Sequence, residues 1–374
     1  MRRIEFDLLP RSWFLLLLLI FLISTLISVS VHAAPPIEEI RTLMAKRALR
    51  PQPKELLAVL DVNNLEASLR ALDPYARYVP SSSSSSDTSL TAHFGIEIFA
   101  YKSRLWVRPD FGGPADQAGI PEIGELLAIN NKKVHGEDLD WISALIDKAK
   151  RDDHLSLTVA SRPGGKGKTY KVKPATVQSS SITWRRVGAD IVIRINEFAS
   201  HDTAPCLAAI FTTLVRPGVR VILDLRGCSG GDLYEAIEIA GMFVASGLPL
   251  ANTYDRSGAV QAYRAPAGQK LISPVCVLID RRTASSAEIL AGILRYHHLV
   301  RVVGERSFGK CVSQTLIPLS DGSGLWLTTL GISFPDNTSC SEAGIKPDIP
   351  MPDVSVAKYS DILKRITDDI RVHR

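Results

Sequence analysis

The spacing of apolar residues changes along the chain and divides it into segments. From Ile37 to Leu72 apolar residues recur every three or four positions, the spacing of one helix face, and Asp73-Pro74 ends the pattern. Residues 81–86 are all serine, which indicates a flexible linker rather than a packed element. We therefore expect an N-terminal helical segment at 34–80 and a new folded unit that begins near residue 90.

Residues 90–176 predict a small β-rich domain that carries two helical pieces. A turn-rich Gly112-Gly113-Pro114 lies between the expected second strand and the first helix. The pattern predicts strands at 95–100, 104–107, 126–130 and 155–160, with helices at 115–118 and 140–149.

Residues 177–352 alternate short apolar runs with amphipathic stretches. The runs predict strands at 191–195, 219–225, 275–279 and 300–303, separated by helices at 203–214, 233–245 and 287–296. Alternation of this kind predicts a mainly parallel sheet covered by helices, an α/β core that can hold a catalytic site at its strand ends. Residues 353–374 are expected to form a C-terminal helical tail.

The first 33 residues differ in kind from the rest. Arginines at the start precede a nearly uncharged stretch at 13–31, which small residues around Ala33 follow. This order is that of an export signal peptide cleaved after Ala33. The apolar stretch of about 19 residues is also long enough to span a bilayer, so an uncleaved N-terminal anchor is the alternative. Either way we expect the body outside the cytoplasm, in the periplasm or membrane-anchored.

Composition narrows the classes of function. A chain of 374 residues with 45% hydrophobic and 22% charged residues can bury more than one core. The net charge of +5 is spread along the chain, so we expect no nucleic-acid partner. The five cysteines show no disulfide framework, and neither a CxxC nor an HExxH pattern occurs. We expect no metal and no other cofactor.

A first candidate for chemistry is Ser285, which follows an apolar strand and a turn of small residues and precedes a helix. A hydroxyl placed there is exposed beside the N–H groups of the helix start, which is oxyanion-hole geometry. However, Ser285 and Glu288 also form the S-x-x-E pattern of a capping box, which occurs at many helix starts. This segment alone leaves both interpretations open.

Two further predicted strands are each followed by a turn that contains glycine. Lys310 follows Phe308-Gly309, where a lone lysine is normally a solvated charge. The loop that ends at Gly230-Gly231 follows the apolar run at 221–225, and its glycines allow backbone N–H groups to approach an oxyanion or a phosphate. The loop lacks the G-x-x-x-x-G-K-[ST] spacing of a phosphate-binding P-loop.

Together the three segments resemble the C-terminal processing, or tail-specific, serine peptidases. The matching motifs are Leu223-Asp-Leu-Arg226 with the glycines to 231, Thr283-Ala-Ser-Ser-Ala-Glu288, and Phe308-Gly-Lys310 with Gln314. In that family the nucleophilic serine lies 25 residues before the lysine, which here selects Ser285 rather than Ser286. Leu72-Asp-Pro-Tyr75 and the segment 344–348 extend the resemblance over about residues 37–350.

The resemblance implies a crotonase-like (ClpP-like) α/β protease core at 177–352 with a PDZ domain at 90–176, inserted or preceding. It implies a Ser-Lys dyad in which Ser285 is the nucleophile and Lys310 the general base. We expect burial to lower the pKa of Lys310, with the Gln314 side chain orienting its amine. Backbone N–H groups of Ser286, Gly230 and Gly231 are expected to receive the oxyanion.

The PDZ-like segment implies how substrates arrive. Such domains add an extended peptide to a strand and hold its terminal carboxylate on loop N–H groups, here near Phe94, Gly95 and Ile96. Glu97 stands where the family usually has a second glycine, which is expected to weaken or re-aim carboxylate binding. The implied activity is endoproteolysis of unfolded or C-terminally tagged proteins; the oligomeric state stays open, self-association included.

The main rival hypothesis is a catalytically silent, peptide-binding scaffold of the same fold. Cys228 and Cys311 replace the residues expected in their turns, and Arg281-Arg282 adds charge before Ser285. Retention of the serine, the lysine and Gln314 favours an enzyme.

Since Cys228 and Cys311 would flank one cleft, an oxidising compartment could bridge them, unless both are small buried core residues that never meet.

Overall fold

The computed structural model describes residues 35–58, 60–81, 92–134, 139–176 and 180–372. The predicted signal peptide or anchor and most of the serine run lie outside these residues. Within the described ranges, no helix has the length and apolar character needed to cross a membrane.

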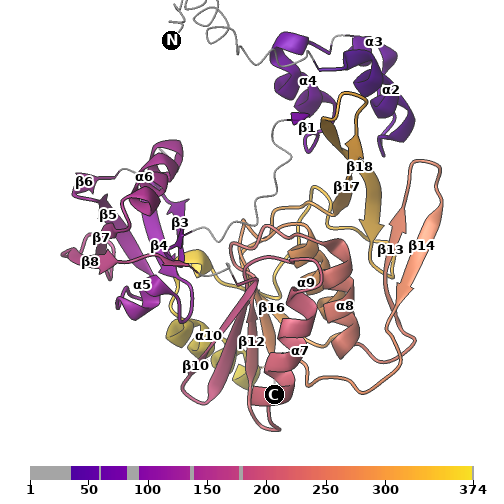
Figure 1. Ribbon diagram of the computed structural model, residues 1–374. Helices are drawn as coiled ribbons and strands as arrows, with labels where there is room; N and C mark the ends of the chain where they lie inside the picture. The colour runs from indigo at the N-terminus through magenta and orange to yellow at the C-terminus, as the bar shows by residue number, and fades with distance from the viewer. Residues whose placement is uncertain (1–34, 59, 82–91, 135–138, 177–179, 373–374) are drawn as a thin grey trace, which may run out of the picture.

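A six-stranded sheet forms the centre of the largest part of the molecule (Figure 1). Its first two strands pair antiparallel, and every later pairing is parallel, as the alternating pattern predicts. Because the parallel strands point the same way, their C-terminal ends lie at one edge of the sheet. In spatial order the strands are β10 (Ile182–Val187), β11 (Asp190–Ile195), β12 (Val221–Asp224), β15 (Cys276–Ile279), β16 (Arg301–Gly304) and β19 (Ile349–Pro350).

Helices cover both faces of this sheet. One face packs against α7 (Thr203–Leu214), α8 (Leu233–Phe243) and α9 (Ser286–Tyr296) in the largest apolar cluster. The opposite face packs against α10 (Tyr359–Val372), through Tyr359, Ile362 and Ile366, after the short 3-10 helix η3 (Val354–Val356). The core therefore has three layers, in which β12, β15 and β16 lie between helices on both faces of the sheet.

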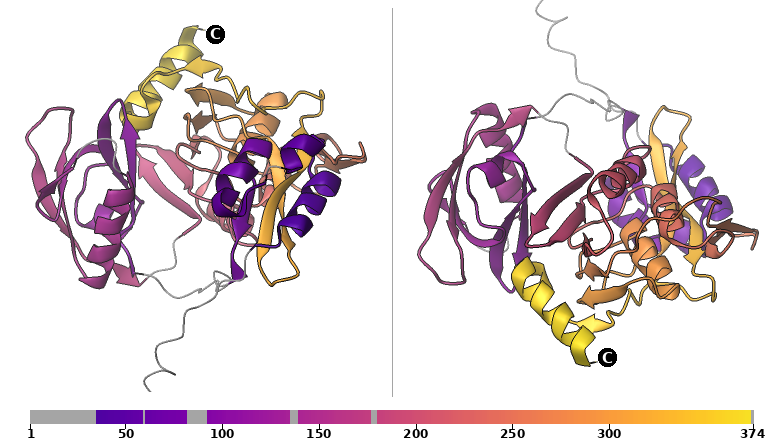
Figure 2. Two further views of the ribbon diagram at one scale, coloured as in Figure 1. Left: turned by 90° about the horizontal axis from the view of Figure 1, so that it is seen from above. Right: turned by 90° about the horizontal axis from the view of Figure 1, so that it is seen from below.

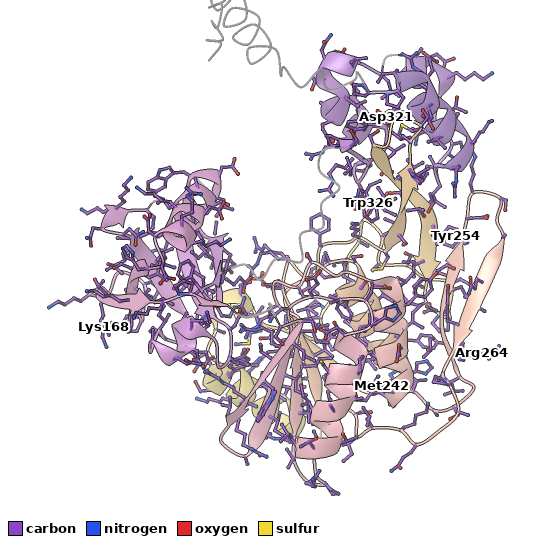
Figure 3. The ribbon with its side chains drawn as sticks, in the orientation of Figure 1. Lys168, Met242, Tyr254, Arg264, Asp321 and Trp326 are labelled. Carbon is purple, nitrogen blue, oxygen red and sulfur yellow. A yellow bond between two sulfur atoms is a disulfide. The ribbon has the colours of Figure 1, made fainter. Side chains whose placement is uncertain are left out.

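A second sheet stands above the core and carries the N-terminal helices. The hairpin of β17 and β18 reaches these helices, with Asp321 near its tip (Figure 3). This sheet consists of β1 (Arg77–Val79), β13 (Pro249–Tyr254), β14 (Val260–Arg264), β17 (Val312–Pro318) and β18 (Gly324–Ser333).

The N-terminal segment is helical, as its periodicity predicts, but it is interrupted. Pro51 and Pro53 lie in the break after the first helix, because proline lacks the N–H that a continuing helix needs. Asp73 caps the last helix, whose apolar face packs on β18. The pieces are α2 (Ile37–Arg47), α3 (Lys54–Ala58), η1 (Val62–Asn64) and α4 (Leu65–Leu72).

A separate β-rich unit lies beside the core, and in both views of Figure 2 α10 lies against it. Its main sheet has the order β3-β4-β5-β7-β8, so β3 is at one edge, and β6 pairs with β5. The predicted strands and helices here are confirmed to within a few residues, whereas β2, β6, β8 and β9 were not predicted; the domain limits stay predictions. The elements are β2 (Ala92–His93), β3 (Ile96–Tyr101), β4 (Arg104–Pro109), α5 (Pro114–Gln117), β5 (Gly124–Ile129), β6 (Lys132–Lys133), α6 (Leu139–Arg151), β7 (Leu155–Ala160), β8 (Lys168–Val172) and β9 (Ala175–Thr176).

Candidate active site

Three turns meet at the C-terminal edge of the central sheet, after β12, β15 and β16. Ala284 N–H donates to the carbonyl of Cys228 over 2.9 Å, which joins the turn after β15 to the glycine loop after β12. Phe308 N–H donates to the carbonyl of Thr283, also over 2.9 Å, which joins it to the loop after β16. The three sequence motifs therefore form one continuous surface.

Ser285 occupies a strained backbone position at the start of α9. Its φ of 55° and ψ of −124° lie outside the regions that residues with a Cβ readily adopt. Gly230 packs against this turn so closely that a Cβ on it would lie 2.7 Å from the Cβ of Ser285. A strained strand-to-helix turn of this kind is how other hydrolases expose a nucleophilic serine.

Glu288 is fully buried and ties the serine turn to the lysine loop. Its Oε2 accepts the main-chain N–H of Ser285 (3.0 Å) and of Lys310 (2.7 Å). Its Oε1 accepts the hydroxyl of Ser307 (2.5 Å) and the N–H of Gly309 (2.7 Å). Glu288 does hold the helix start, as the capping interpretation predicted, but it also holds a second loop that local sequence could not reveal.

A cavity of about 280 Å³ opens where these turns meet. It brings together Ser285, Ser286, Gly231, Lys310 and Gln314 of the predicted site. Gly230 packs against the serine turn just beside it, whereas residues 94–96 lie in the separate β-rich unit. The remaining lining is mostly apolar or small: Ser229, Leu233, Ile289, Val312, Ser313, Trp326 and Ile332, with Trp326 labelled in Figure 3.

Lys310 is partly buried, and its amine has a defined environment. Nζ donates to Oε1 of Gln314 over 2.8 Å and lies 4.9 Å from the ring centre of Tyr75. Burial lowers the pKa of Lys310 below the ordinary lysine value, against a smaller raising effect from the charge of Asp73. Within the described residues no hydrogen bond joins this amine to Ser285.

The glycine loop is fixed against the start of α9. The Ser286 hydroxyl donates to the carbonyl of Gly231 over 2.8 Å, and Phe198 N–H donates to the carbonyl of Gly230 over 3.0 Å. Gly231 has a φ of 139°, and a Cβ there would collide with the Phe198 backbone. Ser286 is the first residue of α9, so its N–H has no acceptor within the helix. This N–H and the glycine loop border the cavity together.

The Leu223-Asp-Leu-Arg226 motif contributes a buried ion cluster that sequence reasoning missed. Arg226 donates to both carboxylate oxygens of Asp224 (2.9 and 2.8 Å), and the Tyr359 hydroxyl donates to the same group over 2.5 Å. Burial by itself would raise the pKa of Asp224, but the charge and hydrogen bonds of Arg226 together with the charges of Arg194 and Arg108 outweigh it, and the pKa lies well below its usual range. The only signal in the sequence was two charged residues inside an apolar run.

Cys228 and Cys311, the pair that an oxidising compartment could have bridged, are not bonded to one another: Cys311 is bonded to Cys340 with a Cα–Cα distance of 5.3 Å. The loop 334–344 folds back onto the lysine loop, where Glu342 N–H donates to the carbonyl of Gly309 over 2.8 Å. Cys228 is a buried free thiol, and burial raises its pKa to about 12. Both cysteines are buried and do not meet, as the alternative interpretation predicted, although Cys311 is bonded to a third cysteine.

Glu97 and Arg282, both departures from the expected pattern, contact one another. The Arg282 guanidinium donates to Glu97 over 2.6 Å and lies 3.8 Å from the ring centre of Phe99. Glu97 also pairs with the buried Arg108 over 3.0 Å. Since Arg282 precedes Ser285 by three residues, β3 of the β-rich unit is attached directly to the serine turn.

Comparison with known proteins shows that the core is similar to one family of peptidases. The family model described as peptidase family S41 matches residues 191–351, which contain all three turns. The carboxy-terminal processing protease CtpA of Bacillus subtilis is 30% identical over 298 residues, which are 77% of this chain and 63% of that protein. A probable CtpA-like serine protease of Staphylococcus epidermidis is 27% identical over 347 residues, 90% of this chain and 68% of that one. The chain thus spans about two thirds of the length of these relatives.

Two solved structures share the fold. A putative S41 protease from Bacteroides fragilis superposes with a TM-score of 0.63 at 17% identity, over 88% of this chain and 97% of that chain. The photosystem II D1 C-terminal processing protease superposes with a TM-score of 0.54 at 24% identity, over 84% of this chain and 92% of that chain.

Proposed function

The chain is a serine-type protease of the C-terminal processing kind, similar to peptidase family S41, and on this premise we propose that Ser285 and Lys310 form its catalytic dyad. The observation that carries the proposal is their shared cavity, in which a strained serine at a helix start faces a half-buried lysine. No histidine is among the residues that line this cavity. A lysine of lowered pKa is the remaining group there that can accept the serine proton.

The proposed reaction is a two-step acyl transfer. Lys310 Nζ accepts the proton of the Ser285 hydroxyl while Oγ forms a bond to the scissile carbonyl carbon. The oxyanion is received by N–H groups of Ser286, Gly230 and Gly231, and the protonated lysine returns its proton to the leaving amine. Water then hydrolyses the acyl-enzyme by the same route. Catalytic hydrogen bonds often form only once substrate is bound, so Lys310 is expected to move towards Ser285.

Substrate side chains are expected to meet an apolar cavity. Leu233, Ile289 and Trp326 line it beside the serine, and no charged side chain other than Lys310 is among its lining residues. A small or medium apolar side chain before the scissile bond suits this lining, because a buried charge would lack a partner.

The β-rich unit is proposed to act as a PDZ domain that binds substrate C-termini. Ile96 and Ile98 of its edge strand β3 and Ile146 of α6 are partly buried against the same apolar cluster, and the free edge of β3 can pair with an added strand. Gly95, at the start of this edge, has a φ of 64°, which suits a tight carboxylate-binding turn. The opposite face of β3 carries Glu97, which contacts the serine turn.

The fold of the core is proposed to be crotonase-like, with Gln314 orienting the lysine amine. An exported location is also proposed, since the cysteine pair at 311 and 340 suits an oxidising compartment and the predicted leader would direct export. Substrates would then be unfolded or tagged proteins met outside the cytoplasm.

A silent peptide-binding scaffold is the competing proposal, favoured by the lack of a serine–lysine hydrogen bond in the described residues. The two proposals are separated by incubating the full chain with an unfolded protein such as reduced casein. We expect fragments from the wild type and none from Ser285→Ala, whose loss of a single hydroxyl leaves folding intact. Ser257→Ala, in the exposed β13–β14 turn, is the matched control. Equal cleavage by Ser285→Ala would contradict the nucleophile assignment.

A further inference from the structure

Tyr75 belongs to a motif that the sequence placed outside the site, yet it lies against Lys310. We propose that Tyr75 is a positioning residue for Lys310: its ring covers the amine, and its main-chain carbonyl sets the orientation of Gln314. This inference rests on the proposed role of Lys310 as the base. It makes the segment between α4 and β1 part of the catalytic machinery.

The main-chain carbonyl of Tyr75 decides which end of the Gln314 amide faces the lysine. Gln314 Nε2 donates to this carbonyl over 2.6 Å, so the other end of the amide, Oε1, is turned to accept from Lys310 Nζ over 2.8 Å. An amide has one accepting end and one donating end. If the carbonyl moved away, the amide could rotate and present N–H groups to the lysine, and a neutral amine would lose its orienting acceptor.

The ring of Tyr75 provides cover for the amine. With Nζ 4.9 Å from the ring centre, the aromatic face occupies space that water would otherwise fill. Exclusion of water favours the neutral amine before reaction.

The Tyr75 backbone is held rigidly to the sheet that carries Gln314. Tyr75 N–H donates to Asp73 Oδ1 over 3.0 Å. Asp73 is buried and also accepts the N–H of Thr328 (2.8 Å) and its hydroxyl (3.0 Å), on β18. β1, two residues after Tyr75, continues as an antiparallel partner of β18 from Arg77. The tyrosine, the glutamine and the lysine are therefore attached to one hairpin.

Charged groups on several elements lie around Lys310 and Tyr75. Asp73, in the turn between α4 and β1, raises the pKa of Lys310, although its carboxylate already accepts three N–H or O–H donors. Glu288, from α9, accepts the main-chain N–H of Lys310. Glu342 pairs with Arg50, and the charges of both act on the Tyr75 hydroxyl. Burial is the largest influence on the amine, so removing the ring should raise the pKa of Lys310.

The test is Tyr75→Leu in the full chain, with kcat/KM for a casein-derived peptide measured from pH 6 to pH 10. We expect the rising limb of the profile to move up by about one pH unit, with about a tenfold loss at neutral pH, because one pKa unit changes the neutral fraction tenfold. Tyr75→Phe retains the ring and should restore the wild-type limb. Tyr78→Leu, in the same segment but directed towards Asp321, should keep the wild-type profile.

A second measurement does not depend on activity. In a Ser285→Ala background, the rate of Lys310 acetylation by acetic anhydride at several pH values, followed by peptide mass spectrometry, reports the amine pKa directly. We expect slower acetylation at neutral pH relative to other lysines after Tyr75→Leu; Tyr75→Met replaces it if thermal unfolding shows that the leucine variant is not folded. An unchanged limb and unchanged acetylation would overturn the inference. Failure of the wild type to cleave any substrate would instead overturn the proposed function.

Discussion

One carboxylate oxygen of Glu288 fixes the backbones of Ser285 and Lys310 relative to one another. This oxygen, Oε2, accepts the main-chain N–H of Ser285 over 3.0 Å and that of Lys310 over 2.7 Å. The two residues belong to different turns, one before α9 and one before β17. Their relative position therefore depends on the buried Glu288 carboxylate, which contacts both turns.

Glu288→Gln should separate the proposed dyad. All four partners of the carboxylate are donors, and an amide presents only one oxygen, so its NH₂ would oppose at least one main-chain N–H. We expect a loss of unfolding free energy of about 3 kcal/mol and a loss of kcat of about 100-fold from misplacement of the base. Denaturant unfolding and peptide cleavage measure the two effects.

Glu238→Gln provides the matched control for this change. Glu238 is exposed on α8, so its substitution should alter neither the free energy of unfolding nor kcat. If Glu288→Gln matched this control in both measurements, the buried carboxylate would not be what aligns the two turns.

Lys310→Arg should be inactive at every pH tested, because a guanidinium does not deprotonate and cannot accept the serine proton. In the wild type, the base is the neutral amine, so activity should rise with pH through a pKa that burial has lowered below 10.5. Activity would thus be present above that lowered pKa and lost as pH falls through it. Lys346→Arg, at an exposed lysine, should retain the wild-type profile; residual pH-dependent cleavage by Lys310→Arg would point to another base.

Reduction of the Cys311–Cys340 disulfide should weaken the lysine loop. The bond closes a separation of 29 residues and follows the proposed base directly, so its loss frees the loop 334–344 that supports Gly309. A loop of this size corresponds to about 3–4 kcal/mol, or roughly 5 °C in Tm for a chain of this length. Scanning calorimetry with and without dithiothreitol measures the shift.

Two cysteine variants serve as controls for the reduction experiment. Cys340→Ser should have a lowered Tm that no longer responds to reductant, whereas Cys206→Ser, at a free cysteine, should respond as the wild type does. A wild-type Tm that is indifferent to reductant, with the bond shown to be broken by thiol titration, would contradict the stabilising role.

Ile98→Asp should reduce preference for substrates with free C-termini. Ile98 lies on the face of β3 that packs towards α6, and a carboxylate there would repel a terminal carboxylate and remove apolar contact. We expect cleavage of a peptide with a free C-terminus to fall towards that of its amidated form. Lys168→Ala on β8, far from the core in Figure 3, should leave the ratio unchanged, and an unchanged ratio in Ile98→Asp would count against C-terminal capture at this edge.

The adjacent serine, Ser286, is an obvious position for a control of Ser285→Ala. The Ser286 hydroxyl, however, donates to the carbonyl of Gly231 and is almost fully buried, so its removal would loosen the glycine loop. An exposed serine such as Ser257 is the better control.

The sequence by itself determined the elements and the candidate chemistry. Apolar runs of four to six residues between amphipathic stretches predicted the parallel strands, because period and length are local properties that survive in any context. The resemblance of three motifs to the C-terminal processing peptidases predicted that Ser285, Lys310 and Gln314 belong to one site, and all three line one cavity.

Only the tertiary structure decided what surrounds those residues. Tyr75, Glu288 and Asp224 each act through contacts with residues far away in the chain, and the partner of Cys311 was set by a loop that folds back from residue 340. Local pattern indicates whether a side chain is buried, but it carries no information about which distant segment buries it. The orientation of Gln314 depends on a hydrogen bond to a residue 239 positions earlier, and only the packing of β1 against β18 brings the two together.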